Sequence, residues 1–277
     1  MLIFHMHMPK TGGTYINHVF TNALGADKTL CHFNTIENVS VDEQVRGGVG
    51  FFSAHMPLSD ICEIASDGGR QSFVITSMRE PLQQLASHIH WLDHFNQMEM
   101  QDQYAGLPAR IKAEVDRIGQ IDFSSPRSLQ DYLTTLSPTG ISLFDNVQTR
   151  YLSRRLGARF FEPIVEEDAR IAKSGAVAID YILFQGRLDC ALPQLSNILG
   201  IELRSTGRQN VSNNARLIDI KNAEIASALT DCVKFDAALY QHCLDCTLAY
   251  HPTASLRNTA LGEKSEVAGS RGGQERE

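Results

Sequence analysis

The chain of 277 residues contains no long apolar run, and cysteine is scarce. No stretch approaches the roughly 18 apolar residues that a membrane-spanning helix needs, and the first residues show neither the basic region nor the apolar segment of an export signal. Six cysteines are too sparse for a small disulfide scaffold. We therefore expect a soluble, cytoplasmic protein whose cysteines are free thiols.

An excess of basic residues is also missing. The 25 lysines and arginines face 32 aspartates and glutamates, which gives a formal net charge of -7 at pH 7. This balance disfavours a nucleic-acid partner and general binding to anionic membranes. Hydrophobic residues make up 43% of the chain, which is enough to fill the core of one large domain or two small ones.

No group of residues has the spacing of a metal site. Cys243 and Cys246 form a Cys-x-x-Cys pair, but the pair lies in a predicted helix, with no second pair and no strand before it. We interpret it as two buried thiols. His88, His90 and His94 share one predicted helix without a glutamate or further ligand at the spacing that completes a site. The sequence thus predicts no bound metal.

Strand and helix patterns alternate along the chain. Residues 2–8 place Phe4, Met6 and Met8 on one side and His5 and His7 on the other, and a helical pattern follows. Further short apolar runs, each suited to a buried strand and each followed by a helical pattern, occupy residues 49–54, 73–76 and 180–185. This alternation predicts an α/β fold with a central parallel sheet flanked by helices.

The domain organisation follows from the remaining patterns. Residues 82–157 are mostly helical and are predicted to form an insertion that caps the sheet. Residues 1–251 then form one α/β domain. Residues 252–277 lose all periodicity and end in glycine, serine, arginine and glutamate, so we expect a disordered polar tail.

The loop between the first strand and the first helix reads Pro-Lys-Thr-Gly-Gly-Thr at residues 9–14. Backbone N–H groups and the positive end of a helix dipole attract anions at such a place. Lys10 adds a point charge, Thr11 and Thr14 add hydroxyl donors, and Gly12 and Gly13 let the backbone close on a phosphate or sulfate. Because the lysine precedes the glycines, an ordinary ATP-binding P-loop is disfavoured.

A second candidate phosphate-binding feature follows the third predicted strand. Arg79 comes at the end of that strand, before Pro81, which suits the first turn of a helix. Its planar fork can bind a phosphate, and Ser87 two turns along the helix can add a hydroxyl. Because ligands bind at the carboxyl ends of parallel strands, we expect this feature and Lys10 to hold opposite ends of one nucleotide. Alternatively, Arg79 pairs with Glu80 or another neighbour, and Ser87 is a surface serine.

Together these motifs resemble those of sulfotransferases that use 3′-phosphoadenosine 5′-phosphosulfate (PAPS), especially the heparan-sulfate 2-O and 6-O type and bacterial relatives. The sequence His-Met-Pro-Lys-Thr-Gly-Gly-Thr at residues 7–14 is similar to their 5′-phosphosulfate loop. Ser-Met-Arg-Glu-Pro at residues 77–81, followed by Ser87, is similar to their 3′-phosphate motif. The segment at residues 146–152 is similar to another that recurs in these enzymes, and weaker similarity lies at 184–186, 208–212 and 236–240.

The resemblance covers about residues 3–245 and implies a P-loop-like three-layer fold, with PAPS as the cofactor and no metal. The chain departs from the family at residues 186–189, where Gly-Arg-Leu-Asp stands in place of something closer to Gly-Leu-Thr-Glu. In this interpretation Lys10 binds the bridging and 5′-phosphate region and stabilises the leaving group, and Arg79 and Ser87 bind the 3′-phosphate. The residues that cradle the 5′ end are Thr11, Gly12, Gly13 and Thr14.

The base that removes the acceptor's proton is predicted to be His55. It follows the second apolar run, which places it at the same crevice as Lys10, and the heparan 2-O enzymes carry their proposed base in a similar segment. The alternative is a histidine that only caps its strand. Asn146, Gln148 and Arg150 either hold an acceptor sugar or brace the cofactor loop.

The sequence therefore predicts a sulfotransferase that moves a sulfuryl group from PAPS onto a free hydroxyl, most simply that of a glycan or glycolipid. Two alternatives stay open. One is a small-molecule kinase that uses ATP with a variant phosphate loop, and the other is a nucleotide-binding module without catalytic activity.

Overall fold

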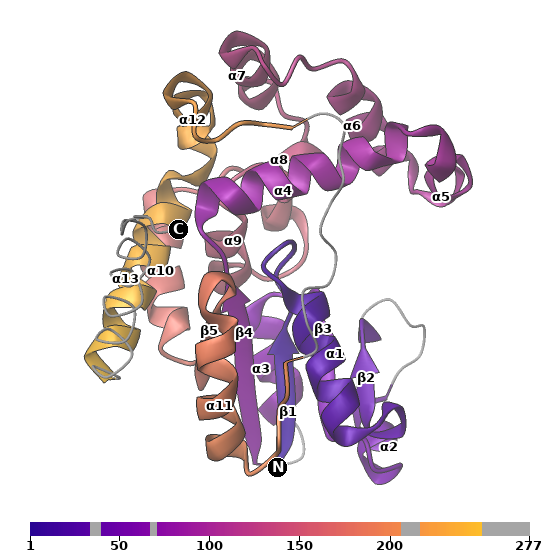
Figure 1. The fold of residues 1–277 in the computed structure, drawn as a ribbon, viewed down its shortest axis with the longest axis vertical. Coiled ribbons are helices and arrows are strands. Elements are labelled where there is room, and N and C mark those ends of the chain that lie inside the picture. Colours follow the sequence, from indigo (N-terminus) through magenta and orange to yellow (C-terminus); the bar gives the residue numbers. More distant parts are fainter. Residues whose placement is uncertain (34–39, 67–70, 206–216, 251–277) are drawn as a thin grey trace, which may run out of the picture.

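The structure, a computed structural model, describes residues 1–33, 40–66, 71–205 and 217–250 (Figure 1). Its centre is a five-stranded sheet in the order β2-β3-β1-β4-β5, and all neighbouring strands run parallel. The predicted tail and the similarity at residues 208–212 lie outside the described residues. The strands are β1 (Leu2–Met6), β2 (Thr29–Cys31), β3 (Phe51–Ala54), β4 (Ser72–Met78) and β5 (Tyr181–Phe184).

Helices cover both faces of the sheet, which confirms the predicted α/β fold with a parallel sheet. The face that carries Ile3 packs against α1 (Gly13–Leu24) and α11 (Leu188–Leu199). The face that carries Phe4 and Met6 packs against four other helices. The predicted alternation along β1 is therefore correct. These four helices are α3 (Leu58–Ser66), α9 (Val147–Ser153), α10 (Glu166–Ala176) and α13 (Lys234–Tyr250).

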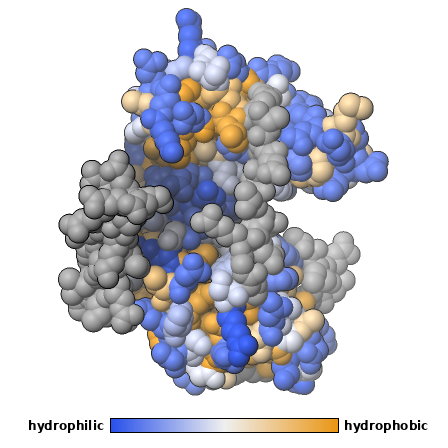
Figure 2. All heavy atoms as spheres, viewed as in Figure 1, coloured by the Kyte–Doolittle hydropathy of each residue, from blue (hydrophilic) through white to orange (hydrophobic). Residues whose placement is uncertain are grey.

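Helices also occupy most of the predicted insertion, residues 82–157; α9 packs against the sheet, and the others lie beyond the carboxyl ends of the strands (Figure 1). Leu85 and Ile89 of its first helix belong to a second apolar core, which Leu229 of α12 (Ala223–Leu229) completes from the far end of the chain. Figure 2 shows the surface hollowed between this part and the sheet, with mainly hydrophilic side chains in the visible hollow. The insertion helices are α4 (Pro81–Asp93), α5 (Gln101–Gly106), α6 (Ala109–Gly119), α7 (Pro126–Thr134) and α8 (Pro138–Phe144).

Besides the 3₁₀ turns, three elements are missing from the sequence prediction: β2, the short helix α2 and α10. β2 has three residues, all of them only half-buried, so it shows no apolar run. α10 buries alanines and one aspartate on its inner face, which gives little hydrophobic contrast. No helix among the described residues is apolar over a length that would cross a bilayer. The short elements are α2 (Val41–Arg46) and the 3₁₀ turns η1 (Ala26–Lys28), η3 (His94–Asn96), η4 (Met98–Met100), η5 (Ala158–Phe161), η6 (Gln185–Arg187) and η7 (Thr230–Val233).

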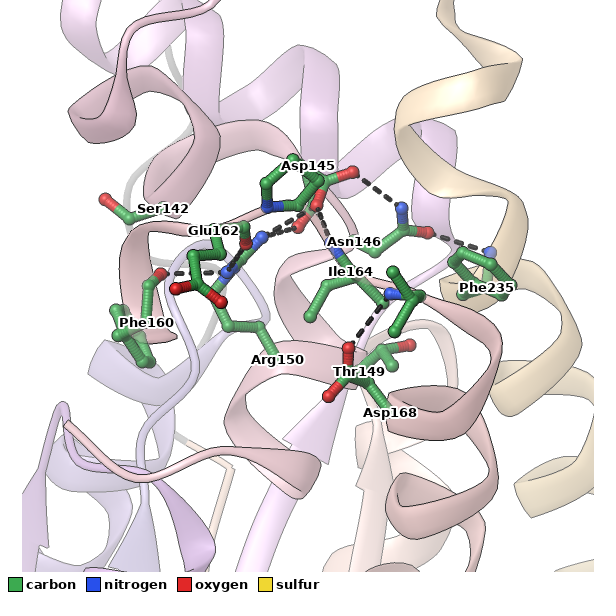
Figure 3. Close-up of polar contacts among 12 residues, drawn as sticks. Ser142, Asp145, Asn146, Thr149, Arg150, Phe160, Glu162, Ile164, Asp168 and Phe235 are labelled. Carbon is green, nitrogen blue, oxygen red and sulfur yellow. Dashed lines mark hydrogen bonds and ion pairs between the residues drawn. The ribbon is translucent and has the colours of Figure 1, made fainter. Parts of the chain in front are cut away.

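The starts of α9 and α13 cap each other. The Asn146 side-chain oxygen accepts hydrogen bonds from the backbone N–H groups of Phe235, at 2.8 Å, and Asp236, at 3.2 Å (Figure 3). In return, the Asp236 carboxylate accepts from the N–H groups of Gln148, at 3.1 Å, and Thr149, at 2.7 Å. Burial raises the pKa of Asp236 to about 6, and these donors oppose the rise. The two helices are thus fixed to each other at the ends that lie near β4.

Candidate functional site

The two predicted phosphate motifs meet at the carboxyl ends of neighbouring strands. β1 leads into the loop that carries Lys10, and β4, which pairs with β1, ends one residue before Arg79. The chain passes from β3 across β1 to β4, so the order of the strands reverses here. Ligands of open parallel sheets bind at such a reversal.

The loop at residues 9–12 has an unusual backbone. Lys10 has a φ of 64° and Gly12 a φ of 98°, so two residues of this short turn adopt the left-handed conformation. A Cβ atom added to Gly13 would lie 2.0 Å from the His7 ring, so only glycine allows this approach. α1 begins at Gly13, and its N-cap Gly12 provides no side-chain cap. The first N–H groups of α1 are therefore suited to an external anion.

Polar side chains fix this loop to β4 and α4. The Thr11 hydroxyl donates to the Met8 carbonyl oxygen at 2.9 Å and also bonds the Ser77 hydroxyl at 2.9 Å. The Gln84 amide of α4 donates to the Pro9 carbonyl oxygen at 2.9 Å. Thr11 is fully buried, so its side chain holds the loop in place, whereas its neighbour Thr14 is exposed.

Arg79 connects the two motifs directly. Its Nη1 donates to the Lys10 carbonyl oxygen at 3.3 Å, and its Nε is buried without a hydrogen-bond partner. The Gln148 side chain holds the Arg79 backbone on both sides: its Nε2 donates to the carbonyl oxygen at 2.8 Å, and its Oε1 accepts from the N–H group at 3.1 Å. The sequence identified Arg79, but it did not predict this clamp.

The charge of Lys10 and Arg79 is not balanced by a carboxylate. Neither side chain forms an ion pair with any residue that the structure describes. Burial lowers the pKa of both; Arg79 lowers that of Lys10 further, whereas the nearby Glu80 carboxylate partly opposes the fall for Arg79. The Glu80 carboxylate instead caps α4, where it accepts from the N–H groups of Leu82 and Gln83. Two adjacent, partly buried cations without a counter-ion form a site for an anion.

His55 lies on the other side of β1, directly after β3. Its Nδ1 donates to the His7 carbonyl oxygen at 2.6 Å, so the neutral ring carries its lone pair on Nε2. Burial lowers the pKa of His55 to about 4, and the His7 carbonyl opposes the fall. At neutral pH the ring is therefore in the form that accepts a proton.

α4 carries the predicted Ser87 and several side chains that interact with Lys10. Ser87 is half-buried on α4, and the Lys10 Nζ lies 5.9 Å from the centre of the Trp91 ring on the same helix. Burial and the Lys10 charge together lower the pKa of His88 to about 3 and that of His90 to about 4. The Nε2 of His90 accepts a hydrogen bond from the Ile218 backbone at 2.8 Å, so this ring helps to hold the segment before α12.

The three residues predicted to hold an acceptor sugar are all buried and all make contacts within the protein. The Arg150 guanidinium donates to the Phe160 and Glu162 carbonyl oxygens, at 2.8 Å each, and pairs with Asp145 at 2.7 Å (Figure 3). Asn146 caps α13 and Gln148 clamps Arg79. Gln148 thus holds the backbone of the second phosphate motif, and both roles considered for the three residues, acceptor binding and bracing of the cofactor loop, stay predictions.

No protein-family model matches the chain, and no curated protein matches its sequence. Any functional conclusion therefore rests on the residues of the site and their arrangement.

We expect Gly13→Ala to lower the free energy of unfolding by about 1 to 3 kcal/mol, because the added methyl group overlaps the His7 ring. Urea unfolding measures the change. Gly50→Ala is the control, since a Cβ atom there meets nothing within 4 Å. The double variant His7→Ala/Gly13→Ala should recover at least about 1 kcal/mol relative to the sum of the single changes. An equal loss in Gly13→Ala and Gly50→Ala would contradict the close approach of His7.

Proposed function

We propose that this protein is a sulfotransferase that moves the sulfuryl group of PAPS onto an acceptor hydroxyl. The observation that carries the proposal is the hydrogen bond from Arg79 Nη1 to the Lys10 carbonyl oxygen, at 3.3 Å. It joins the two motifs that resemble the 5′-phosphosulfate and 3′-phosphate sites of sulfotransferases. PAPS carries anionic groups at both of these positions, so one molecule needs two adjacent cationic sites.

The residues at the site fit this cofactor. Lys10 and the first N–H groups of α1 provide charge and donors for the phosphosulfate, and Gly13 lets α1 begin against the His7 ring. Arg79 offers a buried Nε that has no hydrogen-bond partner, and its guanidinium forms no ion pair with any described residue. Ser87 extends this second site along α4. We accordingly propose a P-loop-like relationship for the fold, with the phosphate loop after the central strand.

The chemistry requires an activated sulfuryl group, which bound PAPS supplies. Transfer of such a group depends mainly on in-line positioning and on stabilising charge at the leaving oxygen. Lys10 and the N–H groups of α1 stabilise the leaving phosphate. A sulfuryl group carries less charge than a phosphoryl group, so these donors suffice without a metal in the proposed reaction. His55, neutral at pH 7, takes the acceptor's proton at Nε2.

The acceptor that we propose is a glycan or glycolipid with a free hydroxyl group. The hydrophilic hollow between the sheet and the insertion supports this choice, because it offers many polar groups to a sugar (Figure 2). An extended polar substrate also needs an open approach to the base.

The 3′-phosphate role of Arg79 predicts a specific change in ligand preference. The wild-type protein should bind 3′-phosphoadenosine 5′-phosphate more tightly than AMP. Arg79→Ala should weaken binding of the bisphosphate by roughly 10- to 100-fold, the value of a charge-assisted contact, and leave AMP affinity nearly unchanged. Isothermal titration calorimetry with both nucleotides measures the difference.

Arg155→Ala is the matched control, since this exposed arginine pairs with Glu63 far from the loop. It should change neither affinity. If Arg79→Ala weakened both nucleotides equally, Arg79 would contact the shared 5′-phosphate, and the assignment of the 3′ site would be wrong.

The base role of His55 predicts a loss of turnover without a loss of cofactor binding. His55→Ala should slow transfer roughly 100- to 10,000-fold, as removal of a general base does, while the affinity for 3′-phosphoadenosine 5′-phosphate stays unchanged. The assay follows release of this product from PAPS in the presence of polysaccharide and glycolipid acceptors. His18→Ala, which changes an exposed histidine of α1, is the control and should retain full activity. Normal nucleotide binding without transfer to any acceptor in the wild type would instead indicate an inactive nucleotide-binding module.

A further inference from the structure

We propose that His7, His32 and His55 form a binding site for Zn²⁺ or a similar transition-metal ion. One ring nitrogen from each lies within 4.8 Å of the others. The ring centres of His7 and His55 are 4.1 Å apart, those of His32 and His55 are 5.2 Å apart, and those of His7 and His32 are 5.3 Å apart. Three imidazoles thus converge from positions that are far apart in the sequence.

The sheet positions all three residues in the same way. Each is the first residue after its strand: His7 follows β1, His32 follows β2 and His55 follows β3. These strands are neighbours in the order β2-β3-β1, and their register sets Met6 opposite Ala54 and Cys31 opposite Ser53. The ligands therefore stand on a rigid edge of the sheet. His32 also has a φ of 57°, a costly backbone conformation that occurs often at functional sites.

Neighbouring groups orient two of the rings. The Nδ1 of His55 donates to the His7 carbonyl oxygen at 2.6 Å, so the lone pair on its Nε2 is the one that can bind a metal ion. Histidine ligands of known metal sites commonly donate their other ring N–H to a carbonyl in this way. His7 is 4% exposed, its ring packs against Gly13, and its buried Nδ1 has no hydrogen-bond partner. His5 stacks behind it at 5.3 Å, held by Asn17. A buried imidazole nitrogen without a partner gains most from a metal ion.

The ligand set selects the kind of ion. Imidazole nitrogen favours zinc, cobalt, nickel or copper, whereas magnesium and calcium need oxygen ligands, and the three converging residues offer none. Three histidines with a fourth position open to water form a common zinc site. Zinc–nitrogen bonds of about 2.0 to 2.1 Å require nitrogens about 3.4 Å apart, so the rings must close by up to about 1.5 Å. Ion binding therefore requires rotation of the His32 and His55 side chains, which are both only half-buried.

A bound ion would also block the proposed transfer. The ion takes the Nε2 lone pair of His55, which is the same electron pair that accepts the acceptor's proton. This second effect rests on the proposed function, whereas metal binding itself does not. Zinc should therefore inhibit transfer, and removal of the ion by a chelator should restore it.

The experiment is a titration of the full-length, chelator-treated protein with Zn²⁺ and, separately, Co²⁺, followed by calorimetry without any nucleotide. We expect one ion per chain. His32→Ala and His55→Gln should each weaken binding at least about 100-fold, since loss of outer-shell partners alone costs 10- to 100-fold. His18→Ala should leave the affinity unchanged, and thermal unfolding checks that each variant is folded.

The cysteine pair provides the decisive control. Cys243 is buried as predicted, but the prediction is wrong for Cys246, which is exposed, and its thiol lies 3.9 Å from the Nε2 of His242 on α13. Loss of the bound ion in Cys246→Ser rather than in His32→Ala would overturn the proposal, as would the absence of binding in the wild type. In the transfer assay, zinc should inhibit the wild type but not His32→Ala. Because calorimetry is independent of PAPS, a protein without transferase activity still tests the metal site.

Discussion

The parallel pairing of β1 with β3 and β4 is the constraint on which the rest of the site depends. Met6 stands opposite both Ala54 and Thr76, so the three chains leave the sheet at nearly the same level. This register therefore brings three features to one edge of the sheet: the loop that carries Lys10, Arg79 just before α4, and His55. The residues come together in this register although they are far apart in the sequence. Because the strand order reverses between β1 and β4, this edge of the sheet is open to a ligand.

The site that results is poor in compensating charge. Lys10 and Arg79 are partly buried beside each other, and the nearest carboxylate, that of Glu80, accepts backbone hydrogen bonds at the start of α4. Burying cations without an ion-pair partner costs free energy, and a bound polyanion offsets this cost. The clamp of Gln148, which the mutual capping of α9 and α13 holds in place, fixes the Arg79 backbone, and the Lys10 carbonyl oxygen accepts from the guanidinium. A side chain that is already held in position loses less entropy when it binds a ligand, so this arrangement favours ligand binding.

Sequence patterns were sufficient for the parts of the molecule that have strong local signals. The apolar runs gave β3, β4 and β5, and the ends of β1, β3 and β4 placed Lys10, His55 and Arg79 in one crevice. The direction of buried polar side chains has no such signal. The Thr11 hydroxyl turns inward to Ser77, and the Arg150 guanidinium donates to four backbone and side-chain oxygens within residues 145–162, because packing between distant segments decides both. The convergence of His32 with His7 depended on β2, whose three half-buried residues lack an apolar run.

The most direct measurement is the thermal unfolding of the wild-type protein with 3′-phosphoadenosine 5′-phosphate, AMP or Mg-ATP at equal concentration. A ligand that binds only the folded state adds about 2.7 kcal/mol at 100 times its dissociation constant, which is easily visible as a shift in Tm. A site built from Lys10 and Arg79 for both ends of PAPS predicts that the bisphosphate raises Tm well above the value with AMP. Stabilisation by Mg-ATP alone would contradict it in favour of a kinase, and no shift with any nucleotide would show that the two cations do not form a nucleotide site.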